Sequence, residues 1–150
     1  MAESASIDDV LHVQRTMRAA DVAELAACGR QPDAIQEAFR ISSHVYTLRL
    51  GGEVAMIYGV VPASLLSAEG VIWALGTDGV TQNAREFLTV SPACLKDCFA
   101  AYNYLYNWVD TRNRASRRWL RWLGFEIREP EPYGPYGMPF HRFDMRVGNV

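Results

Sequence analysis

The chain has 150 residues, 49% of them hydrophobic and 11% aromatic, which suits one globular domain over residues 1–150 and excludes long disorder. A formal net charge of -2 gives no general attraction to nucleic acid or to an anionic membrane, so neither is an expected partner. No apolar run is long enough to cross a membrane, and the first residues lack the features of a secretory signal. We therefore expect a cytoplasmic protein.

The first third of the chain predicts one strand and two helices. Residues 10–17 alternate between apolar and polar side chains, which is the pattern of a strand. A short helix follows, with Asp21 as its N-terminal cap and Gly29 at its end. A second helix runs from Pro32 to Phe39, because proline in a first turn removes no needed N–H donor.

Three apolar runs, at residues 44–50, 53–61 and 71–75, predict a central antiparallel meander. The first two runs are joined by Gly51-Gly52, a pair typical of a two-residue hairpin turn.

The rest of the chain predicts helices and strands in alternation. Ser91 and Pro92 fit the cap and first turn of a helix, so two helices are expected before the next strand. The expected elements are helices over 82–88 and 92–103, a strand over 106–110, a helix over 112–123 and strands near 125–128 and 142–147. The Pro- and Gly-rich segment 129–140 is expected to be a long turn, or a lid over a cleft.

The three cysteines, Cys28, Cys94 and Cys98, are an odd number, which suggests free thiols in a reducing compartment. Cys94 and Cys98 lie four residues apart, but no second pair of cysteines or histidines has the spacing of zinc ligands. No metal site is expected.

The segment from Asn113 to Phe125 carries the strongest signal. Asp110 or Thr111 can cap its helix, and Gly124 can supply the left-handed residue that ends it. Five arginines form a basic face that can contact nucleic acid or an acidic partner, although a solvated face is the favoured interpretation. These arginines are Arg112, Arg114, Arg117, Arg118 and Arg121.

A strand ending in Asp110, an Asn opening an Arg-rich helix and a final Gly-Phe resemble the C-terminal half of the Gcn5-related N-acetyltransferase (GNAT) fold. The resemblance implies an α/β (α+β) fold: a central, mixed, mostly antiparallel sheet of six to seven strands, flanked by about four helices, with splayed fourth and fifth strands. Within the family the chain is most similar to GNAT-like internal virion and accessory proteins of T7-like phages. The phrases that carry this likeness begin at Arg85, Asn107, Arg117 and Pro132.

The resemblance implies that acetyl-CoA binds in the wedge between those two strands. The pantetheine arm would pair with the fourth strand near Leu75, Gly76 and Thr77. Asn113 and Ser116, at the start of the facing helix, would contact the cofactor, and the alternative interpretation of Asn113 is a simple helix cap.

The family binds pyrophosphate with a Gln/Arg-x-x-Gly-x-Gly/Ala pattern, whose small residues let the backbone approach the phosphates. Gln82 matches this pattern, but Arg85 and Phe87 stand where glycines are expected. Either the Arg85 guanidinium binds the pyrophosphate, or a helix starting at Ser91 offers the N–H groups of Ala93 and Cys94.

Several residues that the family uses in catalysis are replaced. The proton-donating Tyr expected seven residues after Asn113 is Leu120. The candidate catalytic residues are Glu53, Tyr106 and Asp110, with His44 and Tyr104 as further candidates by location. Positioning, with a backbone N–H of the fourth strand stabilising the oxyanion, would supply the remaining catalysis.

Two functions follow from the resemblance. The first is a phage-encoded acetyl-CoA-dependent N-acetyltransferase that acts on a host or phage protein or on a small amine. The alternative is a catalytically inactive GNAT-fold protein that binds and modulates a host protein or a virion component. Its place would be the host cytoplasm or the virion. The retained Gln82, Asn113 and Gly124-Phe125 favour the first, whereas Leu120 and the missing glycines favour the second.

Overall fold

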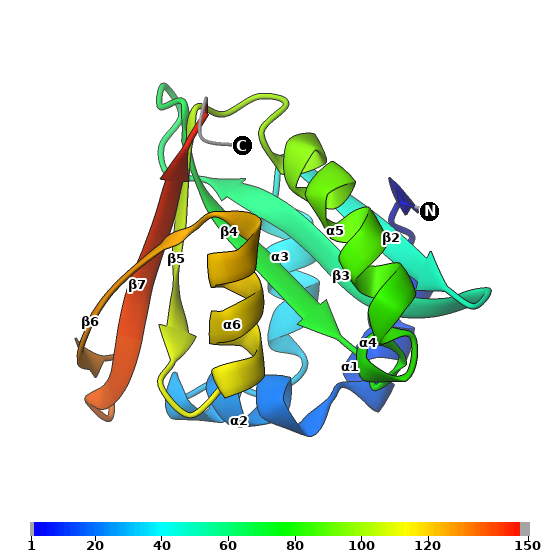
Figure 1. Cartoon of the computed structure of the whole chain (residues 1–150), viewed down its shortest axis with the longest axis horizontal. Coiled ribbons are helices and arrows are strands. Elements are labelled where there is room, and N and C mark those ends of the chain that lie inside the picture. The colour runs from blue at the N-terminus through cyan, green and yellow to red at the C-terminus, as the bar shows by residue number, and fades with distance from the viewer. Residues whose placement is uncertain (1, 148–150) are drawn as a thin grey trace.

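The computed structural model describes residues 2–147 as a seven-stranded sheet with helices on both faces (Figure 1). Six helices lie in this part of the chain, where the resemblance implied about four. The elements are β1 Ala2–Ser4, α1 Ile7–Thr16, α2 Ala19–Ala27, α3 Ala34–Ile41, β2 His44–Leu50, β3 Glu53–Pro62, β4 Glu69–Gly76, α4 Gly79–Gln82, α5 Ala84–Cys98, β5 Tyr104–Asp110, α6 Arg114–Leu123, β6 Glu126–Tyr133 and β7 Met138–Arg146.

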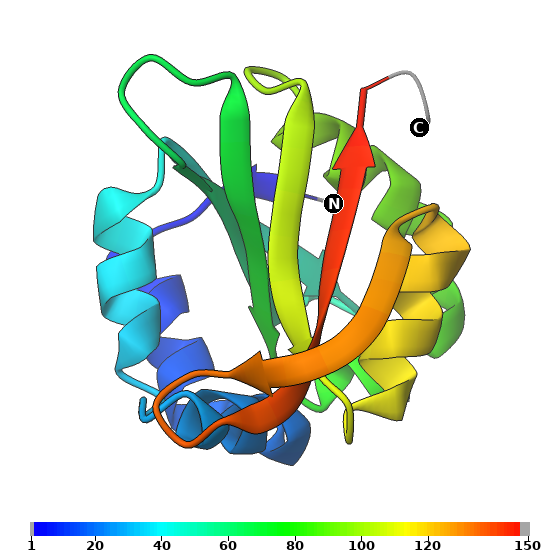
Figure 2. The same ribbon diagram turned by 90° about the vertical axis from the view of Figure 1, so that its left-hand side faces the viewer.

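The strands are ordered β1-β2-β3-β4-β5-β7-β6, and every neighbouring pair is antiparallel except β4 and β5. The expected mixed, mostly antiparallel sheet is confirmed. The order also places β7 between β5 and β6. After β5 the chain passes through α6 and forms β6 at the edge of the sheet, and β7 then returns between β6 and β5. Figure 2 shows β6 curving away at the edge of the sheet.

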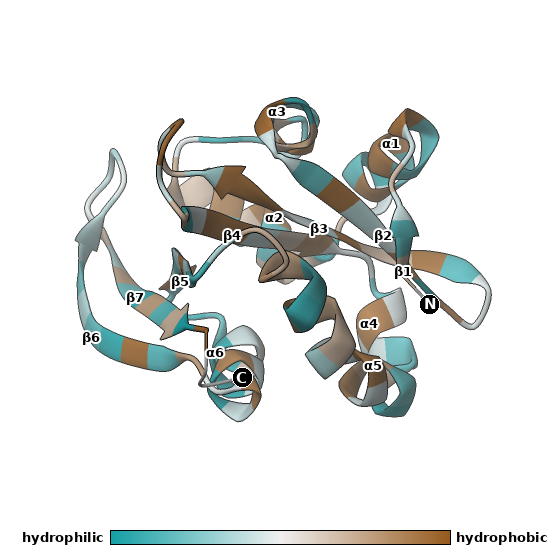
Figure 3. Cartoon of the chain, turned by 90° about the horizontal axis from the view of Figure 1, so that it is seen from above, coloured by the Kyte–Doolittle hydropathy of each residue, from teal (hydrophilic) through white to brown (hydrophobic). Residues whose placement is uncertain are grey.

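Apolar side chains fill both spaces between the sheet and its helices. Val10, Val13 and Ile35 of α1 and α3 are fully buried against Ile57 on one face. On the other face α5 and α6 cover a larger core that includes Leu105. Figure 3 shows these helices in two layers, one on each side of the sheet. Burial of this kind is the main favourable contribution to folding.

Two glycine signals are confirmed by the backbone. Gly51 and Gly52 have φ angles of 58° and 83°, as a tight hairpin turn between twisted strands requires. Gly124 has φ 111° in the left-handed region and ends α6, with the Phe125 N–H donating to the Leu120 carbonyl oxygen.

The strand predicted over residues 10–17 is wrong, because residues 10–16 belong to α1. Ser6 and Asp9 form a capping box, with the Asp9 N–H donating to Ser6 Oγ at 3.2 Å and the Ser6 N–H to Asp9 Oδ2 at 3.4 Å. Val10 and Val13 lie three residues apart on the buried face, which is a helical spacing. A single bridge between Met17 and Thr77 is the only strand-like pairing described for this segment.

The break predicted at Ser91-Pro92 is also wrong, since α5 runs through Pro92. The Ser91 hydroxyl donates to the Phe87 carbonyl oxygen at 2.6 Å inside the helix. The carbonyl that Pro92 leaves without an N–H partner belongs to Leu88, which is exposed on the surface of the helix. A helix start at Ser91, and with it an anion site on Ala93 and Cys94, is therefore excluded.

The segment 129–140 is a hairpin and not a long turn, because β6 continues to Tyr133 and β7 begins at Met138. Its tip lies against the loop after α2. A Cβ atom on Gly29 would be 3.0 Å from Pro135 Cγ, so the glycine allows this close approach. The hairpin thereby closes one side of the region between α2 and the sheet.

We expect Gly59→Ala to destabilise the fold by about 1–3 kcal/mol, as overpacking in a core does. A Cβ atom at this position of β3 would lie 2.7 Å from the His44 carbonyl oxygen and 3.4 Å from the Trp73 indole. Urea unfolding would measure the loss, with Ser64→Ala in the exposed loop after β3 as the control. An unchanged midpoint would contradict this packing.

Candidate active site

Strands β4 and β5 are paired only over their first three residues. Glu69–Val71 pairs in parallel register with Tyr104–Tyr106, and no pairing is described beyond that point. Figure 1 shows the two strands diverging toward their carboxyl ends. The expected splay of the fourth and fifth strands is confirmed.

Asn107 lies where the strands separate. Its Nδ2 donates to the Ile72 carbonyl oxygen at 2.6 Å, and its Oδ1 accepts from the Trp108 N–H at 2.8 Å. The side chain thus makes the last link between β4 and β5. A polar residue at this place in an apolar strand is the sequence signal that points to this link.

The alternation along β4 leaves the N–H and the C=O of one residue, Ala74, directed into the wedge. The Thr77 N–H donates to the Ala55 carbonyl oxygen at 2.9 Å, so the odd-numbered residues of β4 form the bonds to β3. Even-numbered residues therefore direct their N–H and C=O groups toward β5. Ile72 is bound by Asn107, but no bond to the wedge-facing groups of Ala74 is described among residues 2–147.

Helix α2 links the carboxyl ends of the two strands across the mouth of the wedge. Asp21 Oδ2 accepts from the Gly76 N–H at 2.8 Å, and Glu24 Oε1 accepts from the Asp110 N–H at 2.7 Å. The two carboxylates are three residues apart and so lie on one face of the helix. Figure 1 shows α2 lying across the ends of β4 and β5.

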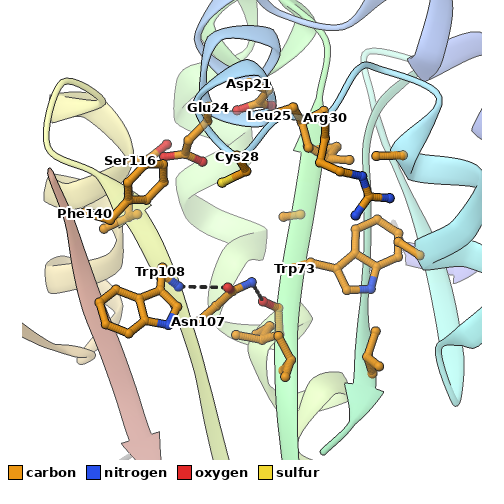
Figure 4. A pocket seen from close by; sticks show the side chains of 18 of the residues that line it. Asp21, Glu24, Leu25, Cys28, Arg30, Trp73, Asn107, Trp108, Ser116 and Phe140 are labelled. Atoms are coloured by element: carbon orange, nitrogen blue, oxygen red, sulfur yellow. Dashed lines mark hydrogen bonds between the residues drawn. The ribbon is translucent and has the colours of Figure 1, made fainter. Parts of the chain in front are cut away.

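A cavity of about 410 Å³ lies between α2, α3, β4, β5 and the β6–β7 hairpin. This volume is within the usual range of small-molecule sites. Figure 4 shows Asp21 and Glu24 on one side of the cavity, with Trp73 and Trp108 on the walls. Ala74 and Ser116 also line it.

Glu24 has the most perturbed carboxyl group of this cavity. Burial raises its pKa to about 7, and the nearby Asp21 and Asp110 carboxylates add to the rise. The bonds from the Asp110 N–H and Asn113 Nδ2 favour the ionised form but do not cancel that effect. Burial likewise raises the pKa of Asp21. A carboxyl group that titrates near neutral pH is suited to general acid–base chemistry.

Asp110, a predicted catalytic residue, is buried and forms an ion pair with Arg112, whose Nη2 lies 2.6 Å from its Oδ2. Burial alone would raise the pKa of Asp110, but the bonds from Arg112 outweigh it and the pKa is lowered. Its side chain does not line the cavity. Its backbone N–H contributes to the site by holding Glu24.

The other predicted catalytic residues do not line the cavity. Glu53 is exposed at the start of β3 and lines a separate hollow, together with Gln82. Tyr106 is half-buried beneath the Arg142 guanidinium, 4.2 Å from its ring centre, and does not line the cavity. The structure therefore does not bring Glu53, Tyr106 and Asp110 together. His44 and Tyr104 also lie outside the cavity lining.

The predicted cofactor residues of β4 differ in their surroundings. Leu75 lines the cavity. Gly76 has both backbone groups occupied, since its N–H bonds Asp21 and its carbonyl oxygen accepts from the Arg18 N–H at 2.9 Å. Thr77 is buried, and its hydroxyl oxygen accepts from the Gly79 N–H at 3.1 Å.

The remaining cofactor candidates lie on helices. Gln82 ends α4 and Arg85 is the second residue of α5, and both are exposed. Asn113 caps α6 in place of Asp110 or Thr111, because its Oδ1 accepts from the Ser116 N–H at 3.3 Å. Its Nδ2 donates to Glu24 Oε1 at 3.4 Å, so the capping residue also orients the carboxylate.

Among residues 2–147, no group of His, Cys, Asp or Glu side chains is suited to hold a metal ion. No helix in this range is long and apolar enough to span a membrane. The three cysteines form no disulfide in the structure.

No protein-family model and no curated protein matches the chain at a significant level. Solved structures do match it. The spermidine N-acetyltransferase of Vibrio cholerae, in complex with CoA and spermine, has a TM-score of 0.73 at 10% identity, over 99% of this chain and 96% of that one.

Two further structures give similar values. An aminoglycoside acetyltransferase in complex with coenzyme A has a TM-score of 0.72 at 14% identity, covering 99% of this chain and 95% of the other. A GNAT-family acetyltransferase from Streptococcus pneumoniae has a TM-score of 0.64 at 11% identity, over 98% and 99% of the two chains. The likeness covers nearly the whole length of each chain, and this chain therefore has the fold of the GNAT acetyltransferases.

Proposed function

We propose that this chain is an acetyl-CoA-dependent N-acetyltransferase whose acceptor amine binds in the cavity beneath α2. One observation carries the proposal. The unpaired Ala74 peptide group of the splayed β4 lines the same cavity as Glu24, whose pKa lies near 7. The similar solved structures are described as acetyltransferases, and two of them hold CoA.

The wedge fits the acyl end of acetyl-CoA. Ala74 offers its C=O at the strand edge to an N–H of the amide-containing arm, and its N–H is left for the oxygen of the acyl group. On the other face of the sheet, a cavity of about 60 Å³ between α5 and α6 shares Ala74, Trp119 and Leu120 with the larger one. Arg85, exposed in the first turn of α5, would hold the pyrophosphate in place of the missing glycines.

Bound acetyl-CoA supplies a thioester whose carbonyl carbon is attacked by the amine, with loss of the CoA thiolate. Ionised Glu24 accepts a proton from the amine, and the Asp110 N–H and Asn113 hold the carboxylate in position. The Ala74 N–H stabilises the negative charge on the carbonyl oxygen. Leu120 has no proton to donate, so the thiolate takes its proton from water.

We expect Arg85→Ala to weaken acetyl-CoA binding by about tenfold or more, since a bond between charged groups contributes about 1.5–3 kcal/mol. Calorimetric titration with acetyl-CoA and with CoA would measure the change. Arg40→Ala is the matched control, because Arg40 is exposed on α3, on the other face of the sheet. Equal affinity of wild type and Arg85→Ala would remove Arg85 from the cofactor site.

Leu120 favours a second candidate, a GNAT-fold protein that has lost catalysis and binds a protein partner. The sequence likeness to phage proteins supports a phage origin and a host protein or virion component as that partner or substrate. The same titration separates the two functions. An absence of acetyl-CoA binding at millimolar concentration would support the second candidate and contradict the first.

A further inference from the structure

We propose that the acceptor is a primary monoamine carried on a flat aromatic body, and neither a polyamine nor a lysine side chain. This proposal rests on the proposed function and specifies its substrate class. It follows from where the cavity under α2 places charge and where it places aromatic rings.

The inner end of the cavity has room for one positive charge. Asp21 already accepts from the Gly76 N–H, and its Oδ1 lies 3.8 Å from Arg18 Nη1. Glu24 is held by two N–H donors but has no cationic partner among the ion pairs of residues 2–147. Arg112 also acts on Glu24 electrostatically, but its guanidinium is paired with Asp110 at 2.6 Å, so Glu24 is the lining carboxylate that an entering ammonium group meets without an ion-pair partner.

The outer part of the cavity offers nothing to a second ammonium group. The third carboxylate of the lining belongs to Glu37, whose Oε2 lies 2.7 Å from Arg30 Nη2. Because this pair is neutral overall and Arg30 itself lines the cavity, a second positive charge gains no net attraction there. This arrangement disfavours amines with several charges spaced along a chain.

Aromatic rings form the walls between these two ends. Trp108 is stacked on Tyr133 with ring centres 4.5 Å apart, and Tyr133 also contacts Phe140 at 5.2 Å. Trp73 Nε1 donates to Ser42 Oγ at 2.8 Å, which fixes the orientation of the indole. Figure 4 shows Trp73 and Trp108 on different sides of the cavity, with Glu24 and Asp21 at its end.

Aromatic side chains held in fixed orientations favour a ligand with a flat aromatic ring over one with only a narrow alkyl chain. Aromatic pairs are stabilised by offset or tilted contacts beyond the area that they bury, and an ammonium near a ring face adds a cation–π interaction. A lysine side chain is a monocation too, but its narrow stem would leave much of the ring surface uncovered. In an arylalkylamine the aryl ring packs against these aromatic side chains, and the amine reaches the Glu24 carboxylate.

The test compares acetyl transfer to tryptamine, 2-phenylethylamine, spermidine and Nα-acetyl-lysine amide by the wild-type protein and by Trp108→Ala. We expect kcat/KM for the two arylalkylamines to exceed that for the other amines by about tenfold or more. Trp108→Ala should raise KM for tryptamine about tenfold and leave KM nearly unchanged for butylamine, which is assayed as an amine without a ring. Trp122→Ala, at an exposed position of α6, is the control. Trp108→Leu replaces the alanine variant if that one fails to fold.

The outcomes separate the two proposals. Transfer to spermidine or to the lysine derivative at a higher kcat/KM than to tryptamine would overturn this inference and leave the acetyltransferase in place. An unchanged KM for tryptamine in the Trp108 variants would also overturn it. No transfer to any amine, together with no calorimetric binding of acetyl-CoA, would contradict the proposed function itself.

Discussion

Glu24→Gln is expected to lower kcat by about 10²–10⁴-fold, the usual contribution of a positioned general base. The base is the ionised carboxylate, and its pKa lies at about 7. The kcat/KM of the wild type should therefore rise with pH up to about 7 and then level off. In Glu24→Gln this rise should be absent, because glutamine does not titrate.

The same substitution should stabilise the fold at alkaline pH. Burial raises the pKa of Glu24 from 4.5 to about 7, so the folded state binds the proton more tightly than the unfolded state. The stability from the protonated form is present below pH 4.5 and is lost as the pH rises through about 7. The loss amounts to about 3 kcal/mol. Glutamine keeps an acceptor for the Asp110 N–H without burying a charge, so Glu24→Gln should be more stable than wild type at pH 8 by up to about that amount.

Urea unfolding at pH 4.5 and pH 8, together with steady-state kinetics, would check both effects. Glu129→Gln is the control, since Glu129 is exposed on β6 and does not line the cavity. Glu53→Gln tests the rival base that the sequence suggested. A collapse of activity in Glu53→Gln with full activity in Glu24→Gln would assign the base to Glu53.

Elements governed by local chemistry could be predicted from the sequence. The hairpin at Gly51-Gly52 and the end of α6 at Gly124 depend on backbone conformations that glycine adopts easily. The strands around them follow from apolar runs bounded by such turns. These signals require no knowledge of distant parts of the chain, and the structure confirms them.

The errors arose where a local pattern had two interpretations. Residues 10–17 fit an alternating pattern, but Val10 and Val13 also fit a helical stripe, and the Ser6–Asp9 capping box just before them decides for the helix. At Pro92 the proline signal favours a helix start. The surrounding helix instead loses one backbone bond at the partly exposed Leu88 and continues.

The candidate site could be predicted only in part, because its key contacts join distant segments. Glu24 and Asp110 are 86 residues apart, and Asp21 and Gly76 are 55 apart. The family resemblance indicates the wedge and Asn113. No local sequence pattern, however, predicts that α2 contacts the ends of β4 and β5. From the sequence alone Asp21 therefore fits a helix cap, and no local pattern distinguishes Glu24 from the other carboxylates.

Ala74→Pro should lower kcat by about 10²–10³-fold, as removal of one oxyanion donor does. Proline lacks the N–H that Ala74 directs into the wedge. The pairing of β4 with β3 should survive, because the odd-numbered residues form those bonds. Leu75→Pro is the matched comparison. It removes an N–H that bonds β3, so it should destabilise the fold much more than Ala74→Pro does.

The pair of variants separates catalysis from folding at neighbouring positions. Circular dichroism and urea unfolding should show a near-native Ala74→Pro and a destabilised Leu75→Pro, while single-turnover acetyl transfer should be slow in Ala74→Pro. Because the proline ring also occupies part of the wedge, an ester bond in place of the Ala74 amide, which removes only the hydrogen, should give the same loss of rate. A full rate in the ester variant would mean that the oxyanion is stabilised elsewhere. Ala74 would then be a neighbour of the reaction and not a participant in it.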